Sequence, residues 1–255
     1  MDAMTPVLRR VRRAAIAIAV VLVLAVIAFV FYASMVMAGD RGAAIKAWEN
    51  PAVSISSTDH SIVMMPTGEA SGTGLVFIPG AKVDPYAYLY KLSGIVESSG
   101  VTVVITKPTL NLAFFDQRPL ALFQDDAPTV SRWFVGGHSL GGVRACQLAG
   151  APGDGAEVAG LVLFGSYCAN DLSSTSLEVL SIGGSEDALS TPEKIEAASS
   201  LLPDDARFEQ VDGLNHAGFG DYGVQPGDGV STLNDNAERV EITALVRSLL
   251  GTDPR

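Results

Sequence analysis

The sequence predicts an α/β fold with a mostly parallel sheet of about eight strands, helices on both faces and one preceding transmembrane helix. Three observations support this prediction. Residues 14–38 contain no charged side chain, and they are numerous enough to cross a membrane as a helix. From residue 75 onward, short continuous apolar runs alternate with helical patterns, as expected when crossover helices connect buried parallel strands. One of these apolar runs ends in a serine between glycines.

Residues 14–38 are expected to form a transmembrane signal-anchor helix. A helix of this length rises about 1.5 Å per residue and can cross a hydrocarbon core of ~30 Å. Arg9, Arg10, Arg12 and Arg13 precede the segment and Asp40 follows it, which predicts a cytoplasmic N-terminus at residues 1–13 and an extracytoplasmic domain. The alternative is secretion after cleavage near Ala38, because residues 36–38 resemble a signal-peptide cleavage site. The apolar run is longer than in most signal peptides, which favours the anchor.

Composition limits the partners. The net charge is −11, and the only basic cluster precedes the membrane segment, so nucleic acid is not expected as a partner.

The cysteines are Cys146 and Cys168. An exported chain permits a disulfide between them, but their spacing does not require one, and free, mostly buried thiols are the expectation.

The globular domain is expected to span residues 51–255, after a polar linker at residues 39–50. Residues 52–57 and 61–65 are expected to pair as a hairpin at one edge of the sheet. The expected parallel strands are 75–78, 101–105, 132–136, 160–164, 177–182 and 206–211. The expected helices are 86–98, 120–127, 143–149, 191–202 and 234–250. In such sheets ligands bind beyond the carboxyl ends of the strands, so residues that follow strands are the candidates for the site.

A serine turn is predicted after the strand at residues 132–136. Gly137, Ser139 and Gly141 form the pattern G-x-S-x-G, between an apolar run and a helix-compatible run. In such a turn the serine adopts strained backbone, and the glycines leave room for it. The hydroxyl is then expected to lie near the first amides of the following helix, which have no partner within the helix. Ser139 is therefore the candidate nucleophile.

His216 is the candidate general base among the three histidines. It lies in the loop just after the last expected strand, at the same edge of the sheet as the serine turn. His60 lies in the edge hairpin and is expected to be a surface residue. His138 precedes Ser139 on the same turn, so its side chain is expected to point away from the serine.

Asp187 is the candidate carboxylate that orients the base, because it follows the strand at residues 177–182. Glu186 is the alternative. Both could instead be turn and capping carboxylates before the helix at residues 191–202. With Asp187 chosen, the chain order is nucleophile, acid, histidine.

Two backbone amides are expected to bind the negative oxygen that develops during acyl transfer. One is the N–H of Leu140, directly after the nucleophile. The other belongs to the loop after residues 75–78, where Gly80 allows close approach and the N–H of Ala81 is the candidate, with Lys82 next to it.

These motifs together resemble the α/β-hydrolase superfamily. The matching segments are residues 77–81, 137–142, 184–187 and 215–216, and the resemblance extends from about residue 62 to the C-terminus. It is closest to the small dienelactone-hydrolase-like subgroup of bacterial exported or membrane-anchored proteins. Dienelactone hydrolases proper carry a cysteine nucleophile, and this chain has Ser139, so the resemblance implies cleavage of an ester or related acyl bond in the broader sense.

The resemblance implies no metal or organic cofactor, and the sequence contains no metal-ligand cluster. Many relatives insert a helical cap at a place where this chain has only residues 165–176, so no sizeable cap and a comparatively open site are expected. Leu110, Leu112, Phe114 and Phe115 could wall an apolar substrate pocket together with Lys82, or could equally be ordinary packing under their loop. The long loop at residues 218–229 is expected to border the site.

The expected function is therefore that of a membrane-anchored serine hydrolase acting on a small-molecule or lipid-like ester. A close variant is an acyltransferase of the cell envelope, in which a hydroxyl group replaces water as the acceptor. A different class of function is a non-catalytic, membrane-tethered binding protein on the same fold.

Overall fold

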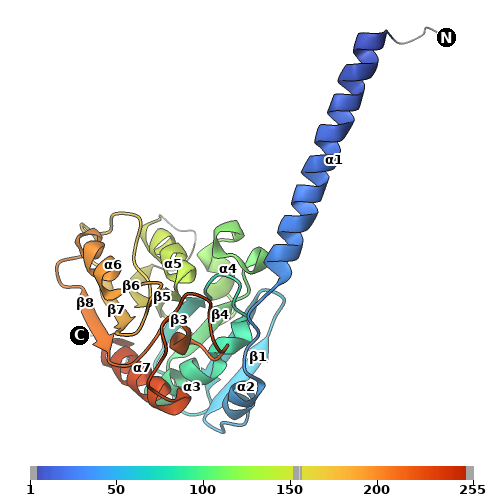
Figure 1. Ribbon diagram of the computed structural model, residues 1–255. Coiled ribbons are helices and arrows are strands. Elements are labelled where there is room, and N and C mark those ends of the chain that lie inside the picture. Colours follow the sequence, from blue (N-terminus) through green and yellow to red (C-terminus); the bar gives the residue numbers. More distant parts are fainter. Residues whose placement is uncertain (1–4, 152–154, 156, 251–255) are drawn as a thin grey trace.

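A sheet of eight strands forms the centre of the domain, and a long helix projects away from it (Figure 1). The computed structural model describes residues 5–151, 155 and 157–250. The strand order is β1-β2-β4-β3-β5-β6-β7-β8, in which β1 and β2 are antiparallel to their neighbours and the other strands run parallel. The predicted fold class and the edge hairpin are thereby confirmed.

The strands are β1 (Val53–Ser57), β2 (Ser61–Pro66), β3 (Thr73–Ile78), β4 (Thr102–Thr106), β5 (Arg132–His138), β6 (Val158–Phe164), β7 (Glu178–Gly184) and β8 (Arg207–Val211). The helices of the domain are α2 (Arg41–Trp48), α3 (Leu89–Ser99), α4 (Leu120–Gln124), α5 (Leu140–Gly150), α6 (Pro192–Ala197) and α7 (Asp235–Leu250). Short 3-10 turns are η1 (Pro85–Tyr88), η2 (Thr109–Asn111), η3 (Ala113–Phe115), η4 (Ser199–Leu201) and η5 (Ala217–Phe219).

Both faces of the sheet are buried, which explains the continuous apolar runs of the central strands. Successive side chains of a strand point to opposite faces. In β3, Leu75 and Phe77 therefore join the core under α2, α3 and α7, whereas Val76 and Ile78 join the core under α4 and α5. All four side chains are at most 3% exposed. Because β3 to β8 run parallel, their carboxyl ends lie at one rim of the sheet.

The N-terminal helix α1 (Pro6–Ser34) is longer on its N-terminal side than the expected span at residues 14–38, and it ends earlier. It is the helix among the described residues that is long and apolar enough to cross a membrane. Its side chains are exposed except at its end, where Ala33 is buried against the domain.

The segment at residues 39–50 was expected to be a polar linker, but it forms the helix α2 on the surface of the domain. Asp40 begins the helix by accepting a hydrogen bond from the N–H of Ala43 at 2.8 Å, which is a common N-terminal cap. Ala43 and Ala47 are buried against the domain. The domain packing therefore starts before residue 51.

The expectation of free thiols was wrong, because Cys146 and Cys168 form a disulfide. Cys146 lies on α5 and Cys168 lies in the segment after β6. The parallel neighbours β5 and β6 carry these two elements at the same rim of the sheet, so residues far apart in the sequence meet there. The bond joins the helix that follows the serine turn to the segment that follows the next strand.

Candidate active site

The candidate residues lie at one rim of the sheet because each of them follows a parallel strand. Ser139 follows β5, Asp187 follows β7 and His216 follows β8. The carboxyl ends of parallel strands lie on the same side, where the crevices of open α/β sheets bind ligands. Ser139 is half-buried, while Asp187 and His216 are 3% and 1% exposed.

Ser139 is held in the strained turn that the sequence predicted. Its backbone has φ 52° and ψ −124°, which is unfavourable for a residue with a Cβ. A Cβ on Gly141 would lie 2.1 Å from the carbonyl oxygen of Ile78, and one on Gly137 would lie 2.5 Å from the carbonyl carbon of Gly141. Only glycine therefore fits at positions 137 and 141.

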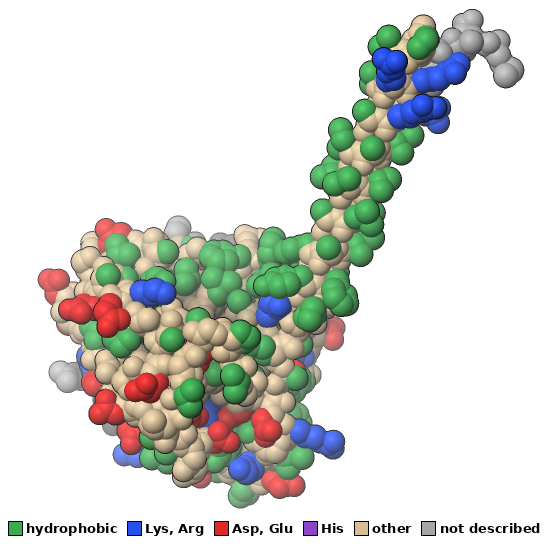
Figure 2. Space-filling model, in the orientation of Figure 1, with side chains coloured by type: hydrophobic (Ala, Val, Ile, Leu, Met, Phe, Trp, Pro, Cys, Tyr) green, Lys and Arg blue, Asp and Glu red, His purple; other side chains and the backbone are tan. Residues whose placement is uncertain are grey.

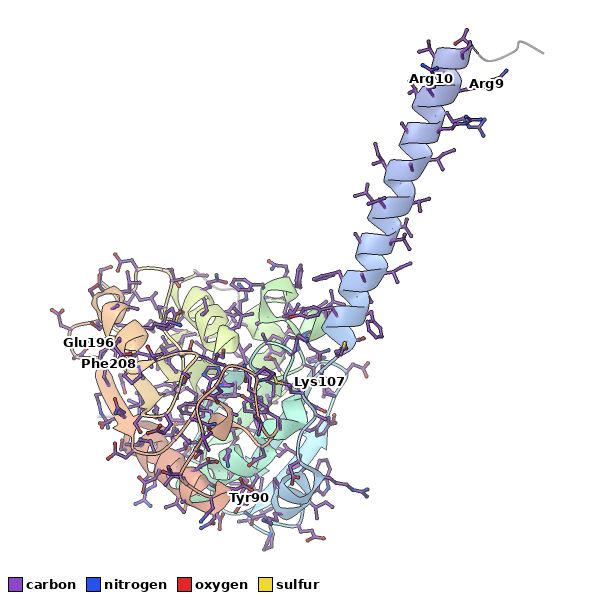
Figure 3. The ribbon with its side chains drawn as sticks, viewed as in Figure 1. Arg9, Arg10, Tyr90, Lys107, Glu196 and Phe208 are labelled. Atoms are coloured by element: carbon purple, nitrogen blue, oxygen red, sulfur yellow. A yellow bond between two sulfur atoms is a disulfide. The ribbon has the colours of Figure 1, made fainter. Side chains whose placement is uncertain are left out.

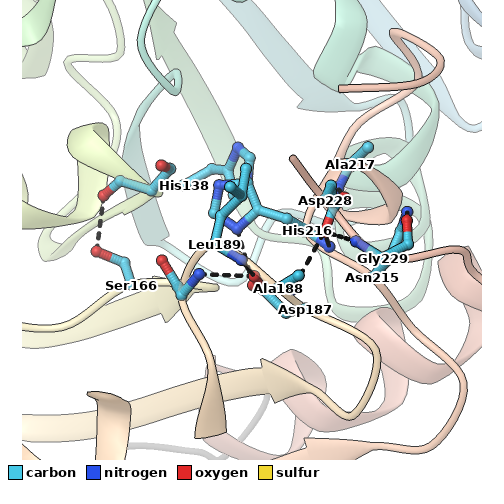
Figure 4. Close-up of polar contacts among 12 residues, drawn as sticks. His138, Ser166, Asp187, Ala188, Leu189, Asn215, His216, Ala217, Asp228 and Gly229 are labelled. Atoms are coloured by element: carbon cyan, nitrogen blue, oxygen red, sulfur yellow. Dashed lines mark hydrogen bonds and ion pairs between the residues drawn. The ribbon is translucent and has the colours of Figure 1, made fainter. Parts of the chain in front are cut away.

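The serine turn is bound to the neighbouring strand β6. The N–H of Ser139 donates to the carbonyl oxygen of Phe164 at 3.0 Å. The hydroxyl of Ser166 donates to the carbonyl oxygen of Ser139 at 2.7 Å (Figure 4). These two bonds fix the serine backbone against the end of β6.

Asp187 and His216 meet directly. The Nδ1 of His216 lies 2.8 Å from Oδ2 of Asp187 (Figure 4). The other carboxylate oxygen, Oδ1, accepts from the backbone N–H groups of Leu189 and Ser190 at 2.9 and 2.7 Å. A carboxylate acceptor at Nδ1 favours the tautomer that carries its proton there and leaves Nε2 as an acceptor. The alternative acid, Glu186, has an exposed side chain and does not take this place.

The pair lies beside the serine turn. A Cβ on Gly165 would lie 2.9 Å from Oδ2 of Asp187 and 3.1 Å from Nδ1 of His216, and the preceding residue, Phe164, binds the N–H of Ser139. The buried Nε2 of His216 has no hydrogen-bond partner among the described residues, so no bond to the hydroxyl of Ser139 is formed. Catalytic hydrogen bonds often tighten only when substrate binds.

His138 packs against the candidate base, a contact that was not predicted from the sequence. Its ring centroid lies 4.4 Å from that of His216, and its Nδ1 lies 3.0 Å from the hydroxyl of Tyr88. Tyr88 also accepts a hydrogen bond from the N–H of Gly80 at 2.9 Å. Complete burial, with a smaller contribution from the charge of His216, holds the pKa of His138 well below its usual value. His138 is therefore neutral beside His216.

The two expected oxyanion donors are unpaired. Among the described residues, the N–H groups of Ala81 and Leu140 have no acceptor. The neighbouring donors are occupied, because Gly80 binds Tyr88 and the N–H of Lys82 donates to the carbonyl oxygen of Asn111 at 2.8 Å. The turn after β3 thus presents one free N–H, that of Ala81, between two bound ones.

Asp228 organises the loops of the site, a role that was not predicted from the sequence. Its carboxylate accepts from the N–H groups of Ala188, His216 and Ala217 at 3.3, 3.2 and 2.8 Å (Figure 4). It therefore joins the loop that carries Asp187 to the loop that carries His216. The expectation that residues 218–229 border the site is confirmed by these contacts. No local pattern in the sequence distinguishes Asp228 from Asp221, the other carboxylate of this loop.

The side chains expected to wall a pocket are mostly exposed. Phe114 and Phe115 are 47% and 50% exposed, and Leu110 is 37% exposed. Leu112 is half-buried. Lys82 extends toward α1, where its Nζ lies 3.6 Å from the centre of the Tyr32 ring.

Within the described part of the chain, no group of three or more His, Cys, Asp and Glu residues could hold a metal ion.

Comparisons with known proteins agree with this fold. Residues 74–240 match the model of the "Alpha/beta hydrolase family", and no curated protein sequence matches the chain. Similar solved structures include a predicted CIB-like hydrolase from Thermoplasma acidophilum, with 12% identity, a TM-score of 0.55 and coverage of 77% of this chain and 100% of the other. A serine hydrolase homologue from Coxiella burnetii has 14% identity, a TM-score of 0.52 and coverage of 77% and 96%. The esterase domain of a Rhodothermus marinus protein has 13% identity, a TM-score of 0.55 and coverage of 76% and 96%.

Proposed function

From the premise that the chain belongs to the alpha/beta hydrolase family, we propose that it is a serine hydrolase that cleaves carboxylic esters through an acyl-enzyme on Ser139. One observation carries this proposal: the hydrogen bond between Asp187 and His216 lies against the strained turn of Ser139. The similar structures from Coxiella burnetii and Rhodothermus marinus are described as a serine hydrolase homologue and an esterase domain, which supports the same reaction class.

In the proposed reaction, Nε2 of His216 accepts the proton of the Ser139 hydroxyl as the oxygen attacks the ester carbonyl. The developing oxyanion binds the free N–H groups of Ala81 and Leu140, and Asp187 stabilises the imidazolium that forms. The imidazolium then protonates the leaving alkoxide, and the alcohol departs. Water, deprotonated by His216, attacks the acyl-enzyme and releases the carboxylic acid. His216 passes the proton of the serine to the alcohol and the proton of the water to the oxygen of Ser139, so the enzyme ends in its starting state.

We propose that helix α1 is retained as a membrane anchor with the domain outside the cytoplasm. Met37 pairs with Val83 as an isolated bridge, and the N–H of Met37 donates to the carbonyl oxygen of Lys82 at 2.7 Å. Cleavage near Ala38 would remove this contact with the turn that holds Ala81. The Cys146–Cys168 disulfide also supports an oxidising compartment.

Hydrolysis of nitrophenyl esters of increasing acyl length tests the proposed reaction. We expect Ser139→Ala to abolish turnover. Asp187→Asn is expected to lower kcat by about 10⁴-fold, because the imidazole loses the partner that fixes its tautomer. Glu186→Gln is the matched control and should leave kcat unchanged, since this neighbouring side chain is exposed. Equal turnover in the wild type and Ser139→Ala would exclude the proposal, and no turnover in folded wild-type protein would favour a binding protein on this fold.

A further inference from the structure

An exposed apolar surface at the end of α1 consists of Leu110, Phe114 and Phe115. We name it the 110–115 surface. Figure 2 shows hydrophobic side chains on the side of the domain that meets α1, while most acidic side chains in this view lie lower or at the opposite edge. We propose that the 110–115 surface inserts into the lipid bilayer beside α1, as a second membrane contact of the protein. The inference rests on the proposed anchoring of α1.

The depth of this surface follows from its contact with the anchor. The uncharged part of the chain begins at Ala14, and about 20 helical residues cross the hydrocarbon core, so the core extends to about Ala33. Phe29 lies one turn earlier, about 6 Å inside that boundary at 1.5 Å per residue. The ring of Phe115 packs edge-on against Phe29 with the centroids 5.6 Å apart. Phe115 therefore lies at the edge of the hydrocarbon.

The next contacts along α1 have the chemistry of the headgroup region. Nζ of Lys82 lies 3.6 Å from the centre of the Tyr32 ring. Tyrosine and lysine are both favoured at this level of a membrane, where an apolar stem meets a polar tip. The side chain of Asn111 then donates to the carbonyl oxygen of Ala33 at 3.4 Å. From Phe29 to Ala33, the contacts thus change from apolar to polar in the order that a bilayer boundary requires.

The position of the 110–115 surface relative to the anchor is fixed by the backbone. The N–H of Lys82 donates to the carbonyl oxygen of Asn111, and Met37 donates to the carbonyl oxygen of Lys82. Leu110 and Asn111 adopt left-handed backbone, with φ 57° and 54°, so the loop is held in a specific conformation. A bilayer that contains α1 would consequently meet Phe114 and Phe115, whose rings are about half exposed.

Depth-dependent fluorescence quenching tests this proposal in the full-length protein. Tryptophan is placed at one of three positions in a Trp48→Phe background, which leaves the buried Trp133 as the other indole. Phe115→Trp reports the surface, Val23→Trp reports the centre of α1, and Phe208→Trp is the matched control. Phe208 is 43% exposed and lies on β8, far from α1 (Figure 3). The protein is reconstituted into phosphatidylcholine vesicles with acyl chains brominated near either the carbonyl or the methyl end.

We expect the tryptophan at position 115 to show blue-shifted emission that lipids brominated near the carbonyl end quench most strongly. The tryptophan at position 23 should be quenched most strongly by bromine near the methyl end, and that at position 208 by neither. Quenching at 23 without quenching at 115 would overturn the proposal while leaving the anchor intact. Blue-shifted but unquenched emission at 115 would also overturn it, because a protein surface would then cover the ring. Absence of quenching at 23 would refute the anchoring and the inference together.

Discussion

Ser139 occupies a backbone conformation that its surroundings impose. A non-glycine residue in such a region costs roughly 1–3 kcal/mol. The cost is offset by the hydrogen bonds of its N–H and C=O groups to Phe164 and Ser166. The same turn leaves the N–H of Leu140 unpaired at the start of α5, where the helix dipole favours negative charge. The strained turn therefore also positions one donor of the proposed oxyanion site.

His138 should make folding sensitive to acid. Because burial lowers its pKa in the folded state, the unfolded chain binds a proton at His138 that the folded protein does not. Stability is therefore expected to fall as the pH drops below the unfolded value of about 6.5, down to the folded pKa. In His138→Gln this loss should be smaller. Urea unfolding between pH 7 and pH 5 measures this loss of stability, with His60→Gln as the control. An identical pH dependence in the wild type and His138→Gln would contradict the prediction.

Among the individual residues of the site, the sequence predicted those whose place depends on a local pattern. Ser139, Asp187 and His216 each come within a few residues after an apolar run, and parallel strands place such residues at one rim. The contact of His138 with His216 and the bonds of Asp228 depend on the paths of long loops. Those paths are set by tertiary contacts that leave no periodic signal in the sequence.

Helix α5 carries the serine turn at one end and a disulfide along its length. Cys146 joins it to Cys168, in the segment that begins with Gly165 and Ser166 beside the site. The disulfide therefore closes a loop that contains β6. In the unfolded chain this closure removes conformational freedom.

Removing the disulfide is expected to lower the free energy of unfolding by about 3 kcal/mol, the value for a loop of this size. The variant is Cys146→Ala/Cys168→Ala, and the measurement is chemical denaturation. Reduced wild-type protein is the control, and it should unfold at the same denaturant concentration as the double variant. If reduction leaves the unfolding midpoint of the wild type unchanged, the bond contributes no stability.

Element by element, the sequence predicted strands better than short helices. The continuous apolar runs of β3 and β4 identify buried strands without reference to the rest of the fold. Helix α2 was missed because its apolar stripe is weak, although Asp40 before it is a cap signal. The expected helix at residues 191–202 is divided into α6 and η4, a change of hydrogen bonding that apolar periodicity does not report.

A buried cluster of charges joins two helices and a loop on one face of the sheet. Nζ of Lys91 on α3 lies 2.9 Å from a carboxylate oxygen of Asp221 and 2.8 Å from one of Glu238 on α7. Burial tends to lower the pKa of Lys91, but the two carboxylates outweigh it and raise the pKa above its usual value. Lys91 therefore remains charged although its side chain is 0% exposed, and it joins α3, α7 and the loop after His216.

Lys91→Met should destabilise the whole domain by about 3–5 kcal/mol, because two buried carboxylates lose their common cation. Chemical denaturation measures the loss, and Lys46→Met on the exposed side of α2 is the matched control with little expected effect. Because the pKa of Lys91 is raised, its contribution is full below the unfolded value of about 10.4 and is lost as the pH rises through the folded value. A Lys91→Met protein as stable as the wild type would show that the cluster is not needed.

The account depends on Ser139 being a nucleophile activated by His216. The most direct measurement is labelling of the full-length protein with a fluorophosphonate, followed by mass analysis of the peptides. We expect one adduct on Ser139 in the wild type, none in Ser139→Ala, and labelling slowed by orders of magnitude in His216→Ala. An unlabelled Ser139 in folded wild-type protein, or equal labelling rates with and without the imidazole at position 216, would contradict it.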